Sequence, residues 1–416
     1  MNPFELKPQP VEAAFHSWSH IYPKAYDKNE VDPYTKTRVI LMNGTEYEAV
    51  WFSHNFQRHC PDNDLRRELA LVRRVEQQQQ KEIAALKPIN ETILEHTISY
   101  EQLAVDLTAA MAQRETDMNV KAALDFGLLE DFDHLYRYSD LLEMEVGVKS
   151  EQLVGHYTEI MPGRPTISEH RFPMDNIRHY IDPKTASPMT KLDVAIITAA
   201  EQQTMNYYMN TSAIYHTDMG RKLYQEIGLI EEQHVSQYGS LMDPTVSFLE
   251  CLLHHEYTEC YLYYSCFEDE TDPAIKLLWE EHFNQEVSHL HAAARLLYKY
   301  EHKEWQECIP DGTFPQLIRL HENKAYIRDI LKNTIQNTSK LENYVDIKDV
   351  PADDVFYQFQ AKLNEPESEV PTHMVISQYQ ERNGKDYRCE DSESPVEGLR
   401  DRKCDNTWLG RYSKQQ

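Results

Sequence analysis

Two short patterns pair a glutamate with a histidine three residues later. They are Glu231 with His234 and Glu286 with His289. Residues three apart lie on one face of an α-helix, so each pattern presents a carboxylate and an imidazole side by side. Glu201 and Glu256 precede the two pairs by the same interval (231 − 201 = 30 and 286 − 256 = 30). Carboxylate oxygens and imidazole nitrogens are the donors that bind transition metals.

An internal repeat adds a third copy of this pattern. Glu101, Asp131 and His134 recur at a constant offset as Glu256, Glu286 and His289 (256 − 101 = 155). The middle copy matches the first less regularly, because Thr116-Asp117 recurs 101 residues later (217 − 116 = 101), whereas Asp131 precedes Glu231 by 100. One residue of slip rotates a helix face by about 100°. The sequence therefore leaves open whether Glu130 or Asp131 faces inward.

The composition of these copies suits a pair of metal ions. Two adjacent ions need several anionic oxygens for charge and bridging, and a nitrogen donor for each ion. The candidate ligands are Glu201, Glu231, His234, Glu256, Glu286 and His289, with Glu101, Asp131 and His134 from the first copy. Each glutamate and the pair that follows it lie at about the same height in a helical hairpin, so the carboxylates can converge.

The elements that must position these residues are helices. From Asp64 to about Leu341 the sequence is helical in character, and the whole chain has only 12 glycines. Breaks between the helical runs predict three hairpins, at roughly 90–145, 189–242 and 245–300. Long helices joined by short turns lie antiparallel to their neighbours. We therefore predict one helical domain over residues 64–345.

The two ends of the chain have a different character. Residues 1–63 are predicted to be an N-terminal arm, in which Asn43-Gly44 lies between two apolar runs. This dipeptide is typical of a tight β-hairpin turn, so a small hairpin is expected there. Residues 346–416 are polar and rich in proline and charge, which predicts an irregular tail.

The region of about 90–300 resembles the ferritin-like superfamily, and within it the rubrerythrin and bacterioferritin types. Such bundles hold a di-iron or di-manganese site with a Glu from each of two helices and Glu-x-x-His from each of the other two. The resemblance implies that Glu201 and Glu256 are terminal ligands, that Glu231 and Glu286 are bridging ligands, and that each metal has one imidazole. Glu259 resembles the extra helix glutamate of rubrerythrins.

The resemblance implies an all-α, ferritin-like bundle of three hairpins that binds two iron or manganese ions. The implied activity is an oxidoreductase that activates O2 or peroxide. Three features depart from the family pattern: there is no rubredoxin-like module, a third hairpin is present, and the connection at Asp243-Pro244 is short. Without a fused electron-transfer module, a separate electron donor is expected.

Two arguments disagree on which two hairpins share the metals. Residue identity favours the second and third, since both have the full pattern. Connection length favours the first with one of the others, because Glu143 to Pro188 could supply the long crossover of a ferritin bundle. We prefer residue identity and keep the first hairpin as a candidate.

Charge and composition exclude several classes of partner. A formal net charge of −27 and a pI near 5.1 argue against nucleic acid and anionic membranes, which attract basic surfaces. The chain begins without a signal peptide pattern, so a cytoplasmic protein is expected. Seven cysteines without Cys-x-x-Cys argue against a disulfide framework or a zinc knuckle. An iron-storage protein and a metal-free bundle are the alternatives, and homo-oligomerisation stays open.

Overall fold

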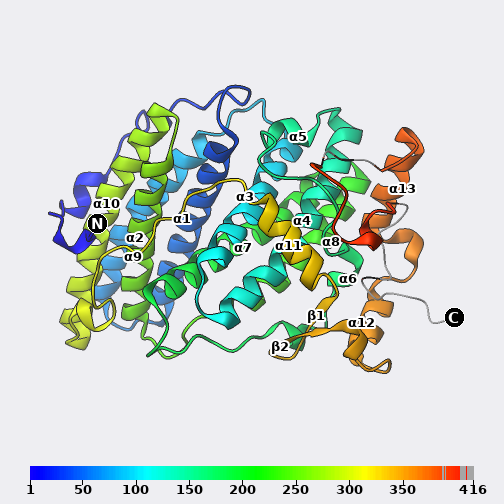
Figure 1. Ribbon diagram of the computed structural model, residues 1–416. Coiled ribbons are helices and arrows are strands. Elements are labelled where there is room, and N and C mark those ends of the chain that lie inside the picture. The colour runs from blue at the N-terminus through cyan, green and yellow to red at the C-terminus, as the bar shows by residue number, and fades with distance from the viewer. Residues whose placement is uncertain (387, 389, 403–408, 410–416) are drawn as a thin grey trace. The chain divides into compact units, whose positions relative to one another are not determined.

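A computed structural model describes residues 1–386, 388, 390–402 and 409. Helices dominate this part of the chain, which confirms the predicted all-α class (Figure 1). The one sheet among the described residues has two antiparallel strands. None of the described helices combines the length and the hydropathy that crossing a lipid bilayer would require.

The chain divides into two compact units, each assembled from three separate stretches. Unit 1 consists of Met1–Glu91, Asp182–Ala200 and Asp243–Leu320. Unit 2 consists of Thr92–Ile181, Glu201–Met242 and the described part of His321–Gln416. These units cut across the predicted arm, helical domain and tail. A helical hairpin has an apolar face that it must bury against another, which is why hairpins distant in sequence pair within each unit.

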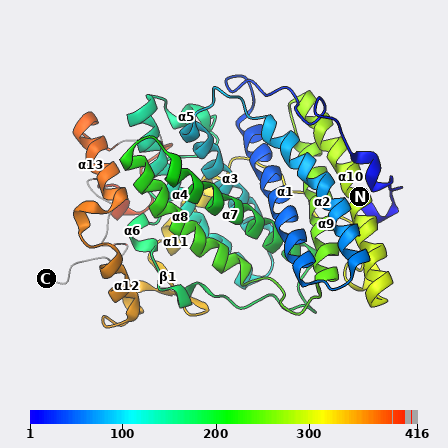
Figure 2. The ribbon, with the colours of Figure 1, turned by 180° about the vertical axis from the view of Figure 1, so that it is seen from behind.

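Unit 1 contains a bundle of two helical hairpins. Its helices are α1 (Pro33–His59), α2 (Asn63–Ala85), α9 (Phe248–Asp269) and α10 (Pro273–Glu301). They run side by side in both views (Figures 1 and 2). The side chains of Asp32, Asp62, Ser247 and Asp272 each accept a hydrogen bond from a first-turn N–H. Such caps satisfy free donors at the helix start and fix where each helix begins.

Unit 2 contains a second bundle of two hairpins. Its helices are α3 (Ile93–Arg114), α4 (Met118–Val146), α7 (Pro188–Ile214) and α8 (Asp218–Gly239). Helix α7 carries the chain from unit 1 into unit 2 after Ala200. The connection from α4 to α7 includes two short helices, α5 (Ser150–Leu153) and α6 (Thr166–Glu169). Helix α11 (Lys324–Thr334) packs against α3 and α4.

The sequence repeat covers four helices in each copy. Helices α1 to α4 begin at Pro33, Asn63, Ile93 and Met118, and α7 to α10 begin 155 residues later at Pro188, Asp218, Phe248 and Pro273 (188 − 33 = 155). The three predicted hairpins are therefore present, and α1–α2 is a fourth. Unit 1 pairs the α1–α2 hairpin of the first copy with α9–α10 of the second. Unit 2 pairs α3–α4 of the first copy with α7–α8 of the second.

The predicted β-hairpin at Asn43-Gly44 is wrong. Both residues lie inside α1, which runs without a break from its cap at Asp32. Residues 34–42 are all buried, so the apolar run before the glycine is a helix packed on several sides and not a half-exposed strand. A buried glycine costs a helix about 1 kcal/mol relative to alanine, and the surrounding packing outweighs this preference.

The prediction of an irregular tail over 346–416 is also wrong for much of its length. The tail forms α12 (Val355–Leu363) and α13 (Pro371–Asn383). The strands β1 (Asn337–Lys340) and β2 (Asn343–Asp346) come just before it, at the end of the predicted helical domain. Helix α13 buries Val375, Ile376 and Tyr379 and packs against α4 and α8. The apolar side of α13 therefore packs against α4 and α8 within unit 2. The polar composition of this segment does not predict that packing. Residues 403–408 and 410–416 of the predicted tail lie outside the described residues.

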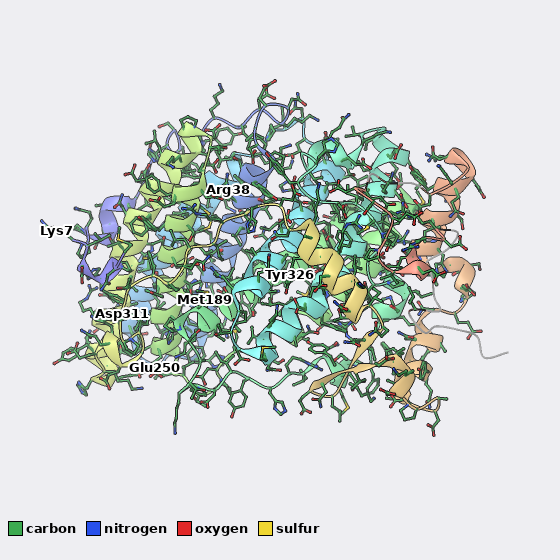
Figure 3. The ribbon with its side chains drawn as sticks, viewed as in Figure 1. Lys7, Arg38, Met189, Glu250, Asp311 and Tyr326 are labelled. Atoms are coloured by element: carbon green, nitrogen blue, oxygen red, sulfur yellow. The ribbon has the colours of Figure 1, made fainter. Side chains whose placement is uncertain are left out.

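One buried ion pair connects the two hairpins of unit 1. Figure 3 labels Arg38 on α1. Its Nε donates to Glu270 Oε2 at 2.9 Å and its Nη1 donates to Asp269 Oδ2 at 3.0 Å. Glu270 Oε1 also accepts from the backbone N–H groups of Thr271 and Asp272, which begin the turn into α10. Burial alone would raise the pKa of Glu270, but Arg38 and these donors lower it below its ordinary value of 4.5.

We predict that Arg38→Met lowers the free energy of unfolding by about 3–5 kcal/mol, because it leaves Glu270 buried without its cation. Arg67→Met, which breaks an exposed pair with Asp64 on α2, is the control and should change little. Urea unfolding followed by circular dichroism measures both. Because the folded-state pKa of Glu270 is lowered, its contribution is present above pH 4.5 and fades as the pH falls further. Equal effects of the two variants would contradict the role of this pair.

Candidate metal centres

In unit 2, the first and second predicted hairpins bring their candidate ligands together. Donor atoms of Asp131, Glu201, Glu231 and His234 all lie within 4.8 Å of one another. Glu101, His134 and Glu231 form a second group by the same distance. Glu231 belongs to both groups, so the six residues form one continuous cluster with a shared carboxylate. None of the six is more than 1% exposed.

Each of the four helices of unit 2 supplies part of this cluster. Glu101 comes from α3 and Glu201 from α7, one carboxylate from the first helix of each hairpin. Asp131 and His134 come from α4, and Glu231 and His234 from α8. The spacing of three places each carboxylate and imidazole on one helical face, as the sequence predicted.

Both imidazoles of unit 2 turn Nδ1 toward the carboxylates. His134 Nδ1 lies 3.1 Å from Glu231 Oε1. His234 Nδ1 lies 3.2 Å from Asp131 Oδ1 and 3.4 Å from Glu231 Oε2. Glu201 Oε2 is 3.7 Å from the same nitrogen. Nδ1 is thus the atom that either histidine would offer to a metal.

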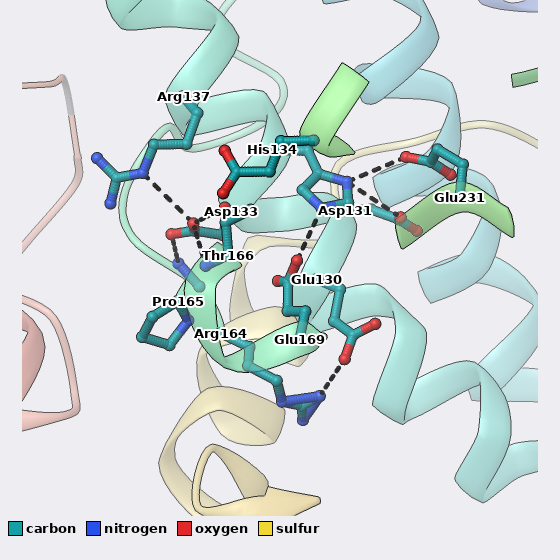
Figure 4. Close-up of polar contacts among 12 residues, drawn as sticks. Glu130, Asp131, Asp133, His134, Arg137, Arg164, Pro165, Thr166, Glu169 and Glu231 are labelled. Carbon is teal, nitrogen blue, oxygen red and sulfur yellow. Dashed lines mark hydrogen bonds and ion pairs between the residues drawn. The ribbon is translucent and has the colours of Figure 1, made fainter. Parts of the chain in front are cut away.

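A carboxylate outside the cluster holds the opposite nitrogen of each imidazole. His134 Nε2 lies 2.9 Å from Glu169 Oε2 on α6 (Figure 4). His234 Nε2 lies 2.7 Å from Glu130 Oε2 on α4. A carboxylate in this position fixes the orientation of a metal-binding imidazole and increases its basicity.

The structure places Asp131 in the cluster and Glu130 behind it. Glu130 accepts hydrogen bonds from Arg171 and, at 3.2 Å, from Arg164. Burial alone would raise the pKa of Glu130, but these guanidinium groups and His234 lower it to about 2. Glu130 is therefore an ionised, arginine-paired support for His234.

The polar atoms of unit 2 fit a bound cation. Apart from their contacts with the two imidazoles, both carboxylate oxygens of Asp131, Glu201 and Glu231 are buried without a hydrogen-bond partner. Burial and the neighbouring carboxylates raise the pKa of Glu201 well above its ordinary value. Burying a polar group without a partner costs free energy. A cation among these oxygens would supply the missing interactions.

Unit 1 contains a second cluster, in which the third predicted hairpin meets α1–α2. Donor atoms of Glu76, Glu256 and His289 lie within 4.8 Å of one another, as do those of Glu256, Glu259 and Glu286. His289 Nδ1 lies 3.0 Å from Glu286 Oε2. Glu46 on α1 accepts a hydrogen bond from the Tyr263 hydroxyl. This cluster is also buried.

The preferred pairing of the second and third hairpins is therefore not what the structure contains. Glu201, Glu231 and His234 meet residues of the first hairpin, whereas Glu256, Glu286 and His289 meet residues of α2. Glu46 does not emerge from the sequence, because a β-hairpin is predicted there. Glu76 does not emerge either, because Gln79 stands where the Glu-x-x-His pattern has a histidine. A signal was present in their spacing, which is the same as in the other hairpins (76 − 46 = 30) and which repeats at the offset of the helices (201 − 46 = 155).

Comparison with known proteins adds no relative. No family model, curated protein or solved structure matches this chain.

We predict that Glu169→Gln weakens metal binding at the unit 2 cluster by about 10- to 100-fold, because the imidazole of His134 loses its carboxylate partner. Glu232→Gln is the matched control, since Glu232 is an exposed neighbour of Glu231. Chelator competition followed by elemental analysis measures the affinity. An affinity equal to that of the wild type would show that Glu169 does not support the cluster.

Proposed function

We propose that this chain is a ferritin-like dinuclear metal oxidoreductase that activates O2 or peroxide. The observation that carries the proposal is the composition of unit 2, in which four helices contribute four carboxylates and two imidazoles to one buried cluster. This is the ligand set that di-iron and di-manganese bundles use. Glu231, which belongs to both donor groups, is the residue expected to bridge two ions.

The residues around the cluster have three tasks under this proposal. Glu130 and Glu169 hold the imidazoles with Nδ1 inward. The Tyr208 hydroxyl donates to Glu101 Oε1 and fixes that carboxylate on α3. Buried apolar side chains pack around the same helices, among them Leu135 and Ile227. These contacts orient the ligands before any metal binds and keep bulk water away.

A bound metal pair would supply a binding place for O2 or peroxide and electrons for its reduction. The chain would provide the ligands and their orientation, and a separate protein or the substrate would restore the electrons. A cytoplasmic location remains part of the proposal. The acidic charge of −27 is consistent with a partner that is neither a nucleic acid nor a membrane.

We predict that wild-type protein, loaded anaerobically with Fe2+, changes its absorbance when O2 is added. His134→Ala/His234→Ala should abolish the change that arises from unit 2 and remove on the order of two metals per chain. His216→Ala, whose side chain is 69% exposed at the α7–α8 turn, is the control. Stopped-flow absorbance and elemental analysis measure the two results.

Two outcomes would contradict the proposal. An iron content that rises to hundreds of ions per assembly would indicate storage. Wild-type protein that shows no change with O2 or peroxide, at full metal content, would rule out the oxidoreductase.

A further inference from the structure

The two clusters differ at one equivalent position on the second helix of a hairpin. Gln79 on α2 lies at the position of His234 on α8 (234 − 79 = 155). Gln79 is 1% exposed, and its Nε2 donates to Glu286 Oε1. Its Oε1 is buried without a hydrogen-bond partner. Unit 1 thus has a neutral carboxamide where unit 2 has an imidazole.

A second difference adds a carboxylate to unit 1. Glu259 is 0% exposed, and neither of its oxygens has a hydrogen-bond partner. The equivalent residue of unit 2 is Ala104 (259 − 104 = 155). His255 Nε2 approaches Glu259 Oε2 at 3.5 Å from the next turn of α9. The remaining oxygen, Oε1, is free for a ligand.

The complete donor set of unit 1 is rich in oxygen. It would consist of the carboxylates of Glu76, Glu256, Glu259 and Glu286 and the imidazole of His289, which form the two donor groups. The carboxylate of Glu46 and the carboxamide of Gln79 join them at the positions equivalent to Glu201 and His234. None of these residues is more than 2% exposed. Unit 2 has four carboxylates and two imidazoles.

We propose that unit 1 holds a second metal centre that favours Mn2+ over Fe2+ more strongly than the centre of unit 2 does. Carboxylate and carbonyl oxygens suit Mn2+, whereas imidazole suits iron. Exchange of one imidazole for a carboxamide and addition of one carboxylate both shift the donor set toward oxygen. One chain then carries two centres of different metal preference.

The surroundings of the unit 1 cluster resemble those of a built site. His282 Nε2 lies 2.8 Å from Glu82 Oε2. Glu82 is one turn after Gln79 on α2, and His282 is one turn before Glu286 on α10. A narrow cavity of about 10 Å³, room for one water molecule, reaches Glu76, Glu256 and His289. Glu68, whose side chain is 41% exposed, lines the same cavity. Glu68 Oε2 is paired with Arg295 Nη2 at 3.4 Å.

The centre in unit 1 rests on the proposed function only where it is compared with unit 2. Metal binding in unit 1 and oxidoreductase activity in unit 2 can therefore be tested separately. In the His134→Ala/His234→Ala background, any metal that remains belongs to unit 1. We expect on the order of two metals per chain in this background, and we expect Glu286→Gln added to it to remove them. A background protein that folds by circular dichroism but holds no metal overturns the inference, whatever the wild type does with O2.

The metal preference is tested by loading with equal concentrations of Mn2+ and Fe2+ without oxygen. In the same background, Gln79→His should lower the ratio of Mn to Fe several-fold by elemental analysis. Glu259→Ala should also lower the ratio of Mn to Fe. Ala104 at the equivalent position of unit 2 shows that the bundle tolerates alanine there. The converse variant, His234→Gln in an otherwise wild-type chain, should raise the ratio. An unchanged ratio in both Gln79→His and Glu259→Ala overturns the preference.

Discussion

The interaction on which this protein depends is the repulsion among carboxylates buried inside two helical bundles. Glu101, Asp131, Glu201 and Glu231 lie together in unit 2, none more than 1% exposed. Isolated buried charges cost far more than a small domain can offset. The apolar side chains around them stabilise the bundle but cannot neutralise this charge. Two imidazoles offset it in part, and bound cations would offset the rest. The same constraint operates in unit 1, where the buried carboxylates are more numerous and the imidazoles fewer.

Connection lengths explain which hairpins can share a cluster. The link from α8 to α9 is short, from Gly239 to Phe248, and it joins helices that belong to different units. No crossover is needed there, because α8 and α9 do not pack in the same bundle. The link from α4 to α7 is long and joins two hairpins of unit 2. Chain geometry was therefore a better guide to the pairing than residue identity, because both copies of the repeat have nearly the same ligands.

The sequence predicts much of the helical structure and most candidate ligands of one of the two clusters. The hairpins over 90–300 and the candidate ligands of unit 2 other than Asp131 follow from spacing, because a helical period places chemical groups on one face whatever the context. The facing of Glu130 and Asp131 does not follow, since the slip between copies allows both, and only the arginines of the α4–α7 connection decide it. Helix α1 was hidden by Asn43-Gly44, whose turn preference yields to burial. Gln79 hid the ligand pattern of α2, because a search for Glu-x-x-His passes over it.

The long α4–α7 connection does more than join two hairpins. It supplies Glu169 to His134, and Arg164 and Arg171 to Glu130. Thr166 of the same segment donates to Asp133 Oδ2 at 2.9 Å, which fastens the connection to α4 (Figure 4).

The two hairpins of unit 1 are joined by no such segment, because the whole of α3 to α8 lies between α2 and α9 in the chain. Its imidazole reflects this: His289 Nε2 has no hydrogen-bond partner among the described residues, although it is equivalent to His134 Nε2. The residue equivalent to Glu130 is Gln285, which is neutral (285 − 130 = 155). An imidazole with a carboxylate behind it is a more basic ligand than one without. The supporting carboxylates Glu130 and Glu169 therefore belong to unit 2, and the residue of unit 1 equivalent to Glu130 carries no charge. The two clusters thus differ in the groups behind their imidazoles as well as in their candidate ligands. The imidazoles of unit 2 are the more basic nitrogen donors.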